Sequence, residues 1–211
     1  MKIDIKDPRF FYQDVAESIV ESILGLFEEG IKSFESYEPW PYSIPISSPE
    51  EDIGYFNWRM NVARSQHIPD TGYDLYGLAG RDYADEPSID ITIVLPPRKH
   101  QKKIAIRKPE IFEVVSHEIH HLAQNIDNNT HMRSTGHTGK LAYFLDPYEI
   151  EAFHIGVRAR ASLTGESFES IAKNYIRKTW KEGTRKQIDD ICQAWKDTSF
   201  PAFYRNTKGM L

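Results

Sequence analysis

Near its middle the chain reads Val115-Ser116-His117-Glu118-Ile119-His120-His121-Leu122, which contains the pattern His-Glu-x-x-His. Apolar residues recur on both sides of it at helical spacing, which predicts a helix from Pro109 to about Ile126. Positions i and i+4 share one face of a helix, so the rings of His117 and His121 can converge on one zinc ion. Glu118 lies about 100° further round, where it can serve as the base that takes a proton from the attacking water.

The pattern His-Glu-x-x-His is rare enough to indicate a real metal site. In a chain with 8 histidines it is expected by chance roughly 0.02 times. The alternative is an amphipathic helix that carries surface histidines without a metal. The helical context of the motif favours zinc as the cofactor.

A catalytic zinc usually takes three protein ligands and leaves one position for water. The residues that could supply the third ligand all follow the motif: His131, His137, Asp146, Glu149, Glu151 and His154. A metzincin would need a glycine and a further histidine soon after the motif, and the run Leu122 to Asp127 contains neither.

A second helix, predicted from Pro147 to about Leu163, carries two glutamates in its first turns. The stretch from Pro109 to Leu163 resembles the gluzincin type of zinc metallopeptidase, in which a glutamate on such a helix, commonly followed by alanine, is the third ligand. Among gluzincins it is most similar to compact members of the ImmA/IrrE kind and small phage-encoded peptidases. The pair Glu151-Ala152 fits that pattern, so the resemblance implies Glu151 as the third ligand, with Glu149 as the alternative.

The sequence departs from the larger gluzincins in two ways. The gap from His121 to Glu151 is longer than in thermolysin-like chains, and Ile155 stands where an aspartate often supports a zinc histidine. The residues that hydrogen-bond to the zinc ligands and hold them in place are therefore expected to differ from those of the larger gluzincins.

The resemblance implies hydrolysis of a peptide bond, for which a hydrogen-bond donor must stabilise the developing oxyanion. Four residues near the ligands could donate: His137, Tyr143, Tyr148 and His154. Of these, Tyr148 and His154 are the preferred candidates. Two other functions stay open: a zinc-containing regulatory or phage structural or binding protein without peptidase activity, and a peptidoglycan-directed amidase or endopeptidase.

The remaining segments predict an α+β fold in which an N-terminal helix and a small mixed or antiparallel sheet pack on the motif helix. An apolar stripe predicts a helix over Pro8 to Ile31, and the Pro- and Ser-rich stretch 38–49 is expected to hold little regular structure. Alternation over Ser88 to Leu95 predicts a strand, either at the sheet edge beside the cleft or in its interior. Two helices are predicted at the C-terminus, about Glu166 to Lys181 and Thr184 to Lys196.

Length and composition favour one domain. The 211 residues and 40% hydrophobic content predict a single folded domain, which the resemblance implies is zinc-peptidase-like. Its N-terminal lobe is expected over about 1–107, and a helical lobe that holds the metal site over about 108–211. Cys192 is the only cysteine, so a thiolate zinc site and an intramolecular disulfide are excluded.

The net charge and the hydropathy of the chain indicate which classes of partner to expect. The resemblance implies a protein or peptide substrate. A net charge of −5 without a concentrated basic face predicts no nucleic-acid partner, and the basic run 98–103 is read as a solvated turn. No signal-like or membrane-spanning segment is recognised, so no membrane partner is expected. The expected location is cytoplasmic, or virion-associated if the chain is phage-encoded.

Overall fold

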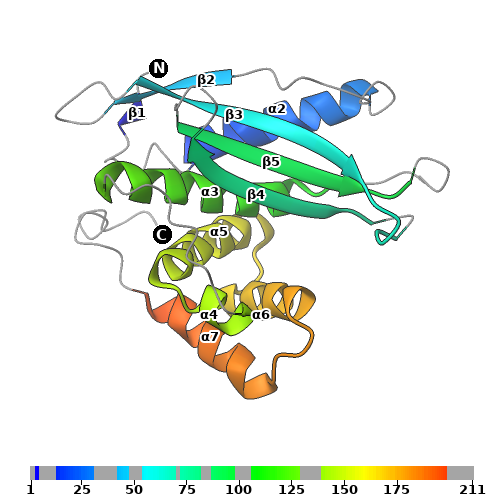
Figure 1. Cartoon of the computed structure of the whole chain (residues 1–211), viewed down its shortest axis with the longest axis vertical. Helices are drawn as coiled ribbons and strands as arrows, with labels where there is room; N and C mark the ends of the chain where they lie inside the picture. The colour runs from blue at the N-terminus through cyan, green and yellow to red at the C-terminus, as the bar shows by residue number, and fades with distance from the viewer. Residues whose placement is uncertain are drawn as a thin grey trace.

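A mixed β-sheet and a stack of helices beneath it make up the chain, as a computed structural model shows (Figure 1). The structure describes residues 3–4, 13–30, 42–47, 54–69, 72–81, 87–97, 106–128 and 139–198. The strands are β1 (Ile3–Asp4), β2 (Tyr42–Ser47), β3 (Gly54–Arg64), β4 (Asp74–Arg81) and β5 (Pro87–Leu95). The helices are α2 (Gln13–Gly30), α3 (Lys108–Asn128), α4 (Lys140–Phe144), α5 (Pro147–Thr164), α6 (Phe168–Thr179) and α7 (Arg185–Asp197).

The sheet has the order β1-β2-β3-β5-β4. β5 pairs in parallel with β3 and antiparallel with β4, so that Ile91 lies between Met60 and Gly77. The strand predicted over Ser88 to Leu95 is therefore confirmed and is an interior strand. Within the described residues, β4 forms the edge of the sheet, and it is β4 that lies over α3.

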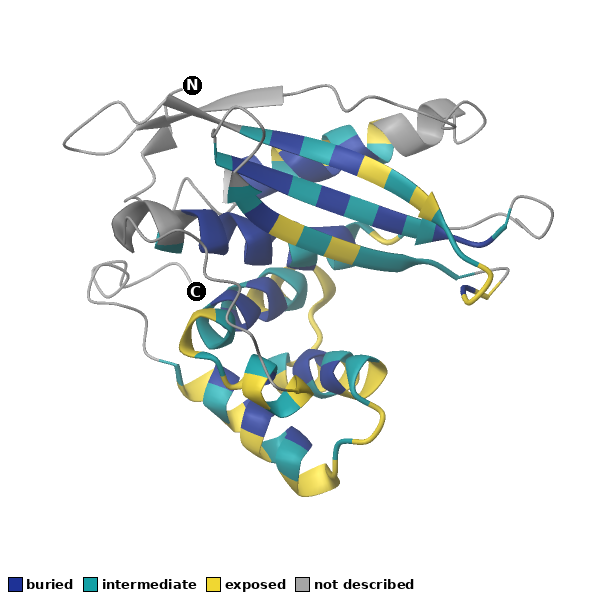
Figure 2. Ribbon diagram, viewed as in Figure 1, coloured by how far each residue is buried: buried dark blue, intermediate teal, exposed yellow. Residues whose placement is uncertain are grey.

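One face of the sheet forms the larger apolar core. Along β5 the alternating residues Ile89, Ile91, Ile93 and Leu95 are fully buried, as the banding of that strand in Figure 2 shows. α2 and α3 contribute the other apolar side chains of this core. Full burial of each such side chain stabilises the fold by about 1.5–3 kcal/mol, so the sheet holds α3 firmly in place.

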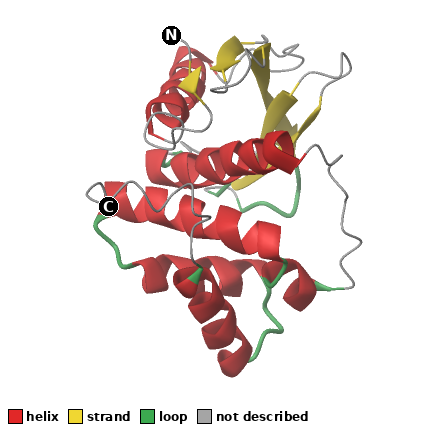
Figure 3. Ribbon diagram, turned by 90° about the vertical axis from the view of Figure 1, so that its left-hand side faces the viewer, coloured by secondary structure: helices red, strands yellow, loops and turns green. Residues whose placement is uncertain are grey.

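α3 is packed on two sides. Ile111, Val115 and Ile119 belong to the core under the sheet. On its other side α3 contacts α5, and Figure 3 shows α3 between the sheet and the helices that follow it in the chain. Gly156 of α5 makes this approach possible, because a Cβ there would lie 2.7 Å from the carbonyl oxygen of Glu113.

The helices after α3 surround a second apolar core, in which Phe144 and Trp195 are fully buried. Sequence signals fix their ends: Asp146 caps α5, Gly165 ends it with a left-handed φ of 71°, and Thr184 forms a capping box at α7. The two cores divide after α3, so the apolar stripe of α3 belongs to the core under the sheet, while its other side contacts α5.

The predicted α+β class is confirmed. The helices predicted from Pro109 and Pro147 agree with α3 and α5, and the two predicted C-terminal helices agree with α6 and α7. The helix predicted over Pro8 to Ile31 is observed over the described part, Gln13–Gly30. No described helix is both long and apolar enough to cross a bilayer.

One expectation is wrong, and one helix was not foreseen. The Pro- and Ser-rich stretch contains β2; its Pro45 lies beyond the two residues that pair with β1, where a missing N–H is tolerated. The short helix α4 was not predicted. The basic run 98–103 lies outside the described residues.

Candidate metal centre and adjoining cavity

Three side chains bring ligand atoms together where α3 meets the start of α5. His117 Nε2 lies 3.1 Å from His121 Nε2, and Glu149 Oε2 lies 3.5 Å from the first and 3.6 Å from the second. Within the described part of the chain, this is the group of histidine and acidic residues that could hold a metal ion. The structure thus joins the two motif histidines to a glutamate of the second helix.

This geometry fits zinc. Ligand atoms about 2.0–2.1 Å from a tetrahedral zinc ion lie about 3.3–3.5 Å from one another, close to the three distances observed. Glu149 Oε2 is buried and, among the described residues, accepts no hydrogen bond. Burial favours its neutral form, but the adjacent rings of His117 and His121 outweigh burial and hold the pKa of Glu149 below its usual value. An ionised oxygen that accepts no hydrogen bond is suited to binding a cation.

The structure brings Glu149, the alternative, into the cluster rather than Glu151, which was predicted as the third ligand. Glu151 is two positions further along α5, about 200° round the helix, and faces the side of α3 rather than the histidine pair. Its Oε2 lies 3.3 Å from Nε2 of His120, and contacts with His120 lower the pKa of Glu151 against the opposing effect of burial.

Gln124 links Glu151 to the histidine pair. Gln124 Nε2 donates to Oε2 of Glu151 at 2.9 Å and to the carbonyl oxygen of Tyr148 at 3.1 Å. With the amide oriented in this way, its Oε1 accepts from Nδ1 of His121 at 2.8 Å. The proton of the neutral ring is then on Nδ1, which leaves the lone pair of Nε2 directed at the cluster. Glu151 therefore acts on the orientation of the His121 ring only through Gln124.

Glu118 lies against the edge strand. Its carboxyl group occupies the place of a side chain at Gly77, since a Cβ there would lie 2.3 Å from Glu118 Cγ. The backbone N–H of Ala79 donates to the carboxylate. Burial raises the pKa of Glu118, which moves the carboxyl group toward the range in which it can both accept and return a proton.

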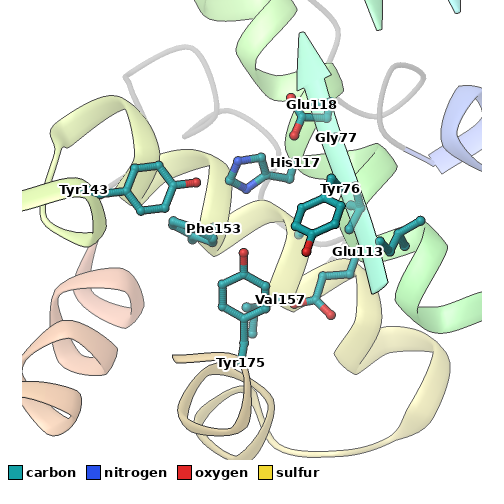
Figure 4. Close-up of a pocket in the computed structure, with 12 residues that line it drawn as sticks. Tyr76, Gly77, Glu113, His117, Glu118, Tyr143, Phe153, Val157 and Tyr175 are labelled. Carbon is teal, nitrogen blue, oxygen red and sulfur yellow. The ribbon is translucent and has the colours of Figure 1, made fainter. Parts of the chain in front are cut away.

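A cavity of about 110 Å³ adjoins His117 and Glu118. It is bounded by β4, α3, α4, α5 and α6, so it lies between the two apolar cores. In Figure 4 the hydroxyls of Tyr143 and Tyr175 point into it, and Tyr143 is directed toward His117. Burial, and then the charge of Glu149, raise the pKa of Tyr143, so its hydroxyl keeps its proton and can donate it in a hydrogen bond.

The two preferred oxyanion donors lie elsewhere. The side chain of Tyr148 is 50% exposed and does not line the cavity. His154 is buried in the second core, where Nδ1 contacts the carbonyl oxygen of Trp195 at 2.6 Å and Nε2 accepts from Arg158 at 2.7 Å. Its burial lowers its pKa to about 4. The structure therefore does not bring these two residues to the cavity: α5 turns His154 toward α7, and Tyr143 lies beside the cluster instead.

A buried acid lies at the other end of the cavity. Glu113, one helical turn before His117, is 7% exposed and accepts a hydrogen bond from Arg160 Nη1 at 3.0 Å. Burial raises the pKa of Glu113, and the guanidinium of Arg160 opposes that rise.

Comparisons with known proteins do not identify the chain. No family model, curated protein or solved structure matches it. The functional proposal therefore rests on the geometry of the site.

Sequence reasoning missed Gly77, Gln124 and Tyr175. Gln124 had a local signal, because it lies three residues after His121 on the same side of the helix. His131 and His137 lie outside the described residues.

Proposed function

We propose that this protein is a zinc-dependent metallopeptidase that hydrolyses peptide bonds in a protein or peptide substrate. One observation carries the proposal: His117, His121 and Glu149 converge within 3.6 Å beside a cavity that also contains Glu118. A structural zinc site would need no carboxylate in Glu118's place and no adjoining cavity. Three ligands with an open side are typical of catalytic zinc.

A zinc ion held by these three residues would polarise the scissile carbonyl and lower the pKa of a water molecule. Glu118 accepts the proton of the attacking water and returns it to the leaving amine, a role that its raised pKa favours. Gln124 and Phe153 hold the rings of His121 and His117, the latter through an edge contact with ring centroids 4.7 Å apart.

The edge strand β4 can bind an extended substrate through backbone hydrogen bonds. Outward- and inward-facing backbone groups alternate along an antiparallel strand. Since the N–H of Ala79 donates to Glu118 rather than to β5, the backbone groups of Gly77 and Leu75 also face the free edge beside the cavity. They can pair with a peptide main chain, as in β-strand addition.

The test is metal content together with hydrolysis. The purified protein is expected to bind one zinc per chain by elemental analysis and to cleave an unfolded protein such as reduced casein. A chelator should abolish cleavage and added zinc should restore it. Failure to bind zinc with submillimolar affinity would overturn the proposal, as would a zinc-loaded protein that cleaves no polypeptide.

Tyr143 is expected to donate to the developing oxyanion. Tyr143→Phe removes the hydroxyl and keeps the ring, so kcat should fall on the order of 10²–10³-fold while zinc content is unchanged. Tyr148→Phe, at the exposed position, is the matched control and should retain kcat. Equal losses in the two variants would contradict this role for Tyr143.

A further inference from the structure

The cavity beside the metal cluster has an uneven distribution of charge. Its lining includes two carboxylates, those of Glu113 and Glu118, and no lysine or arginine among the described residues. Glu118 lies beside the cluster, whereas Glu113 is four residues before His117 on α3, about 6 Å along the helix axis. The part of the cavity far from the cluster is therefore acidic.

Glu113 is held in a fixed position. Arg160 reaches its Oε2 at 3.0 Å, and Arg160 itself does not line the cavity. Figure 4 shows the carboxyl group of Glu113 at the cavity, on the side of Tyr76 and Val157. Glu113 is thus paired with a residue that is not part of the cavity lining.

The walls are aromatic. Tyr76, Tyr143, Phe153 and Tyr175 surround the same space. Tyrosine hydroxyls accept hydrogen bonds from ammonium or guanidinium groups, and aromatic faces attract cations. An anionic guest would meet two carboxylates, whereas a cationic guest would add to the pairing that Arg160 already gives Glu113.

We propose that this cavity binds a lysine or arginine side chain of the substrate next to the scissile bond, and that Glu113 determines this specificity. The inference rests on the proposed peptidase function. With the scissile carbonyl at the cluster, an extended lysine side chain of roughly 6 Å spans one helical turn and reaches Glu113. A substrate α-ammonium group is too short to do so.

The first experiment digests a library of random decapeptides, acetylated at the N-terminus, with the zinc-loaded protein and identifies the products by mass spectrometry. Lysine and arginine are expected to be enriched at one position beside the cleaved bond. Cleavage with no such enrichment would overturn the specificity while leaving the peptidase function intact. Cleavage that requires a free α-amino group would also overturn it.

The second experiment compares two peptides that differ only in lysine or norleucine at that position. Glu113→Gln should lower the ratio of kcat/KM for lysine over norleucine on the order of tenfold to a hundredfold, the range of a charged hydrogen bond. Glu166→Gln is the matched control, because Glu166 lies 3.9 Å from Arg160 but does not line the cavity. Its ratio should equal that of the unsubstituted protein.

Glu113→Gln leaves Arg160 without its close partner, so its folding must be checked by thermal melting. If it fails to fold, the double variant Glu113→Gln/Arg160→Met removes both charges, and the lysine preference should again be lost. A preference retained in a folded variant would overturn the role of Glu113.

Binding separates this inference from the peptidase function. Nα-acetyl-lysine amide should bind the zinc-loaded Glu118→Gln protein more tightly than Nα-acetyl-norleucine amide, measured by NMR titration. Selective binding without hydrolysis by the unsubstituted protein would support the cavity and overturn the peptidase. Equal binding of the two probes would overturn the cavity assignment.

Discussion

Glu118→Gln is expected to abolish peptide hydrolysis and to leave the metal in place. The amide is the same size and can still accept the N–H of Ala79, but it cannot take a proton from water. The loss in kcat should be at least on the order of 10²–10⁴-fold, the usual contribution of a positioned base. Zinc content should be unchanged, because Glu118 is not one of the three clustered ligands.

The matched control is Glu169→Gln, a glutamate paired with Lys173 on the exposed side of α6. It should keep full activity. Steady-state kinetics and elemental analysis of the two variants give the comparison. Hydrolysis by Glu118→Gln at the rate of the control would rule out Glu118 as the base.

Glu149→Gln and Glu151→Gln are expected to differ in zinc affinity. Glu151 acts through Gln124 and His120, so its loss should weaken zinc binding about 10- to 100-fold, as for other residues that support a ligand. Glu149 is directed at the cluster, so its loss should exceed that range. Competition with a fluorescent zinc chelator measures both affinities without relying on catalysis.

The same pair of variants tests the choice between the two glutamates. Both substitutions remove one negative charge from the first turns of α5, so a general electrostatic effect would be similar in each. A larger loss of zinc affinity for Glu151→Gln than for Glu149→Gln would reverse the assignment.

The local part of the site could be predicted from the sequence. His117, Glu118 and His121 are placed by the geometry of a single helix, and the apolar stripe of α3 shows which side faces the sheet. The third ligand depends on the rotation of α5 about its own axis, which packing against α3 decides. Gly156 is the contact point of that packing, and Glu149 lies seven residues earlier on the same face. The seven-residue spacing can be seen in the sequence, but it identifies Glu149 only once α3 is known to pack against Gly156.

The edge strand was harder to predict. Gly77 and Gly80 resemble turn residues, yet Gly77 lies inside β4 because the carboxyl group of Glu118 fills its side-chain space. Gly77 and Glu118 are 41 positions apart, so their contact leaves no local pattern in the sequence. Tyr143 and Tyr175 reach the cavity from separate helices for the same reason.

The absence of a side chain at Gly77 also fixes how β4 is aligned in the sheet. A slip of one residue would bring Tyr76 or Leu78 against Glu118, and a slip of two would bring Leu75 or Ala79. Each of these has at least a methyl group where only hydrogen fits. Among these alignments only the native one therefore leaves room for Glu118 where it lies, so correct pairing of the sheet edge and placement of the Glu118 carboxyl group are coupled.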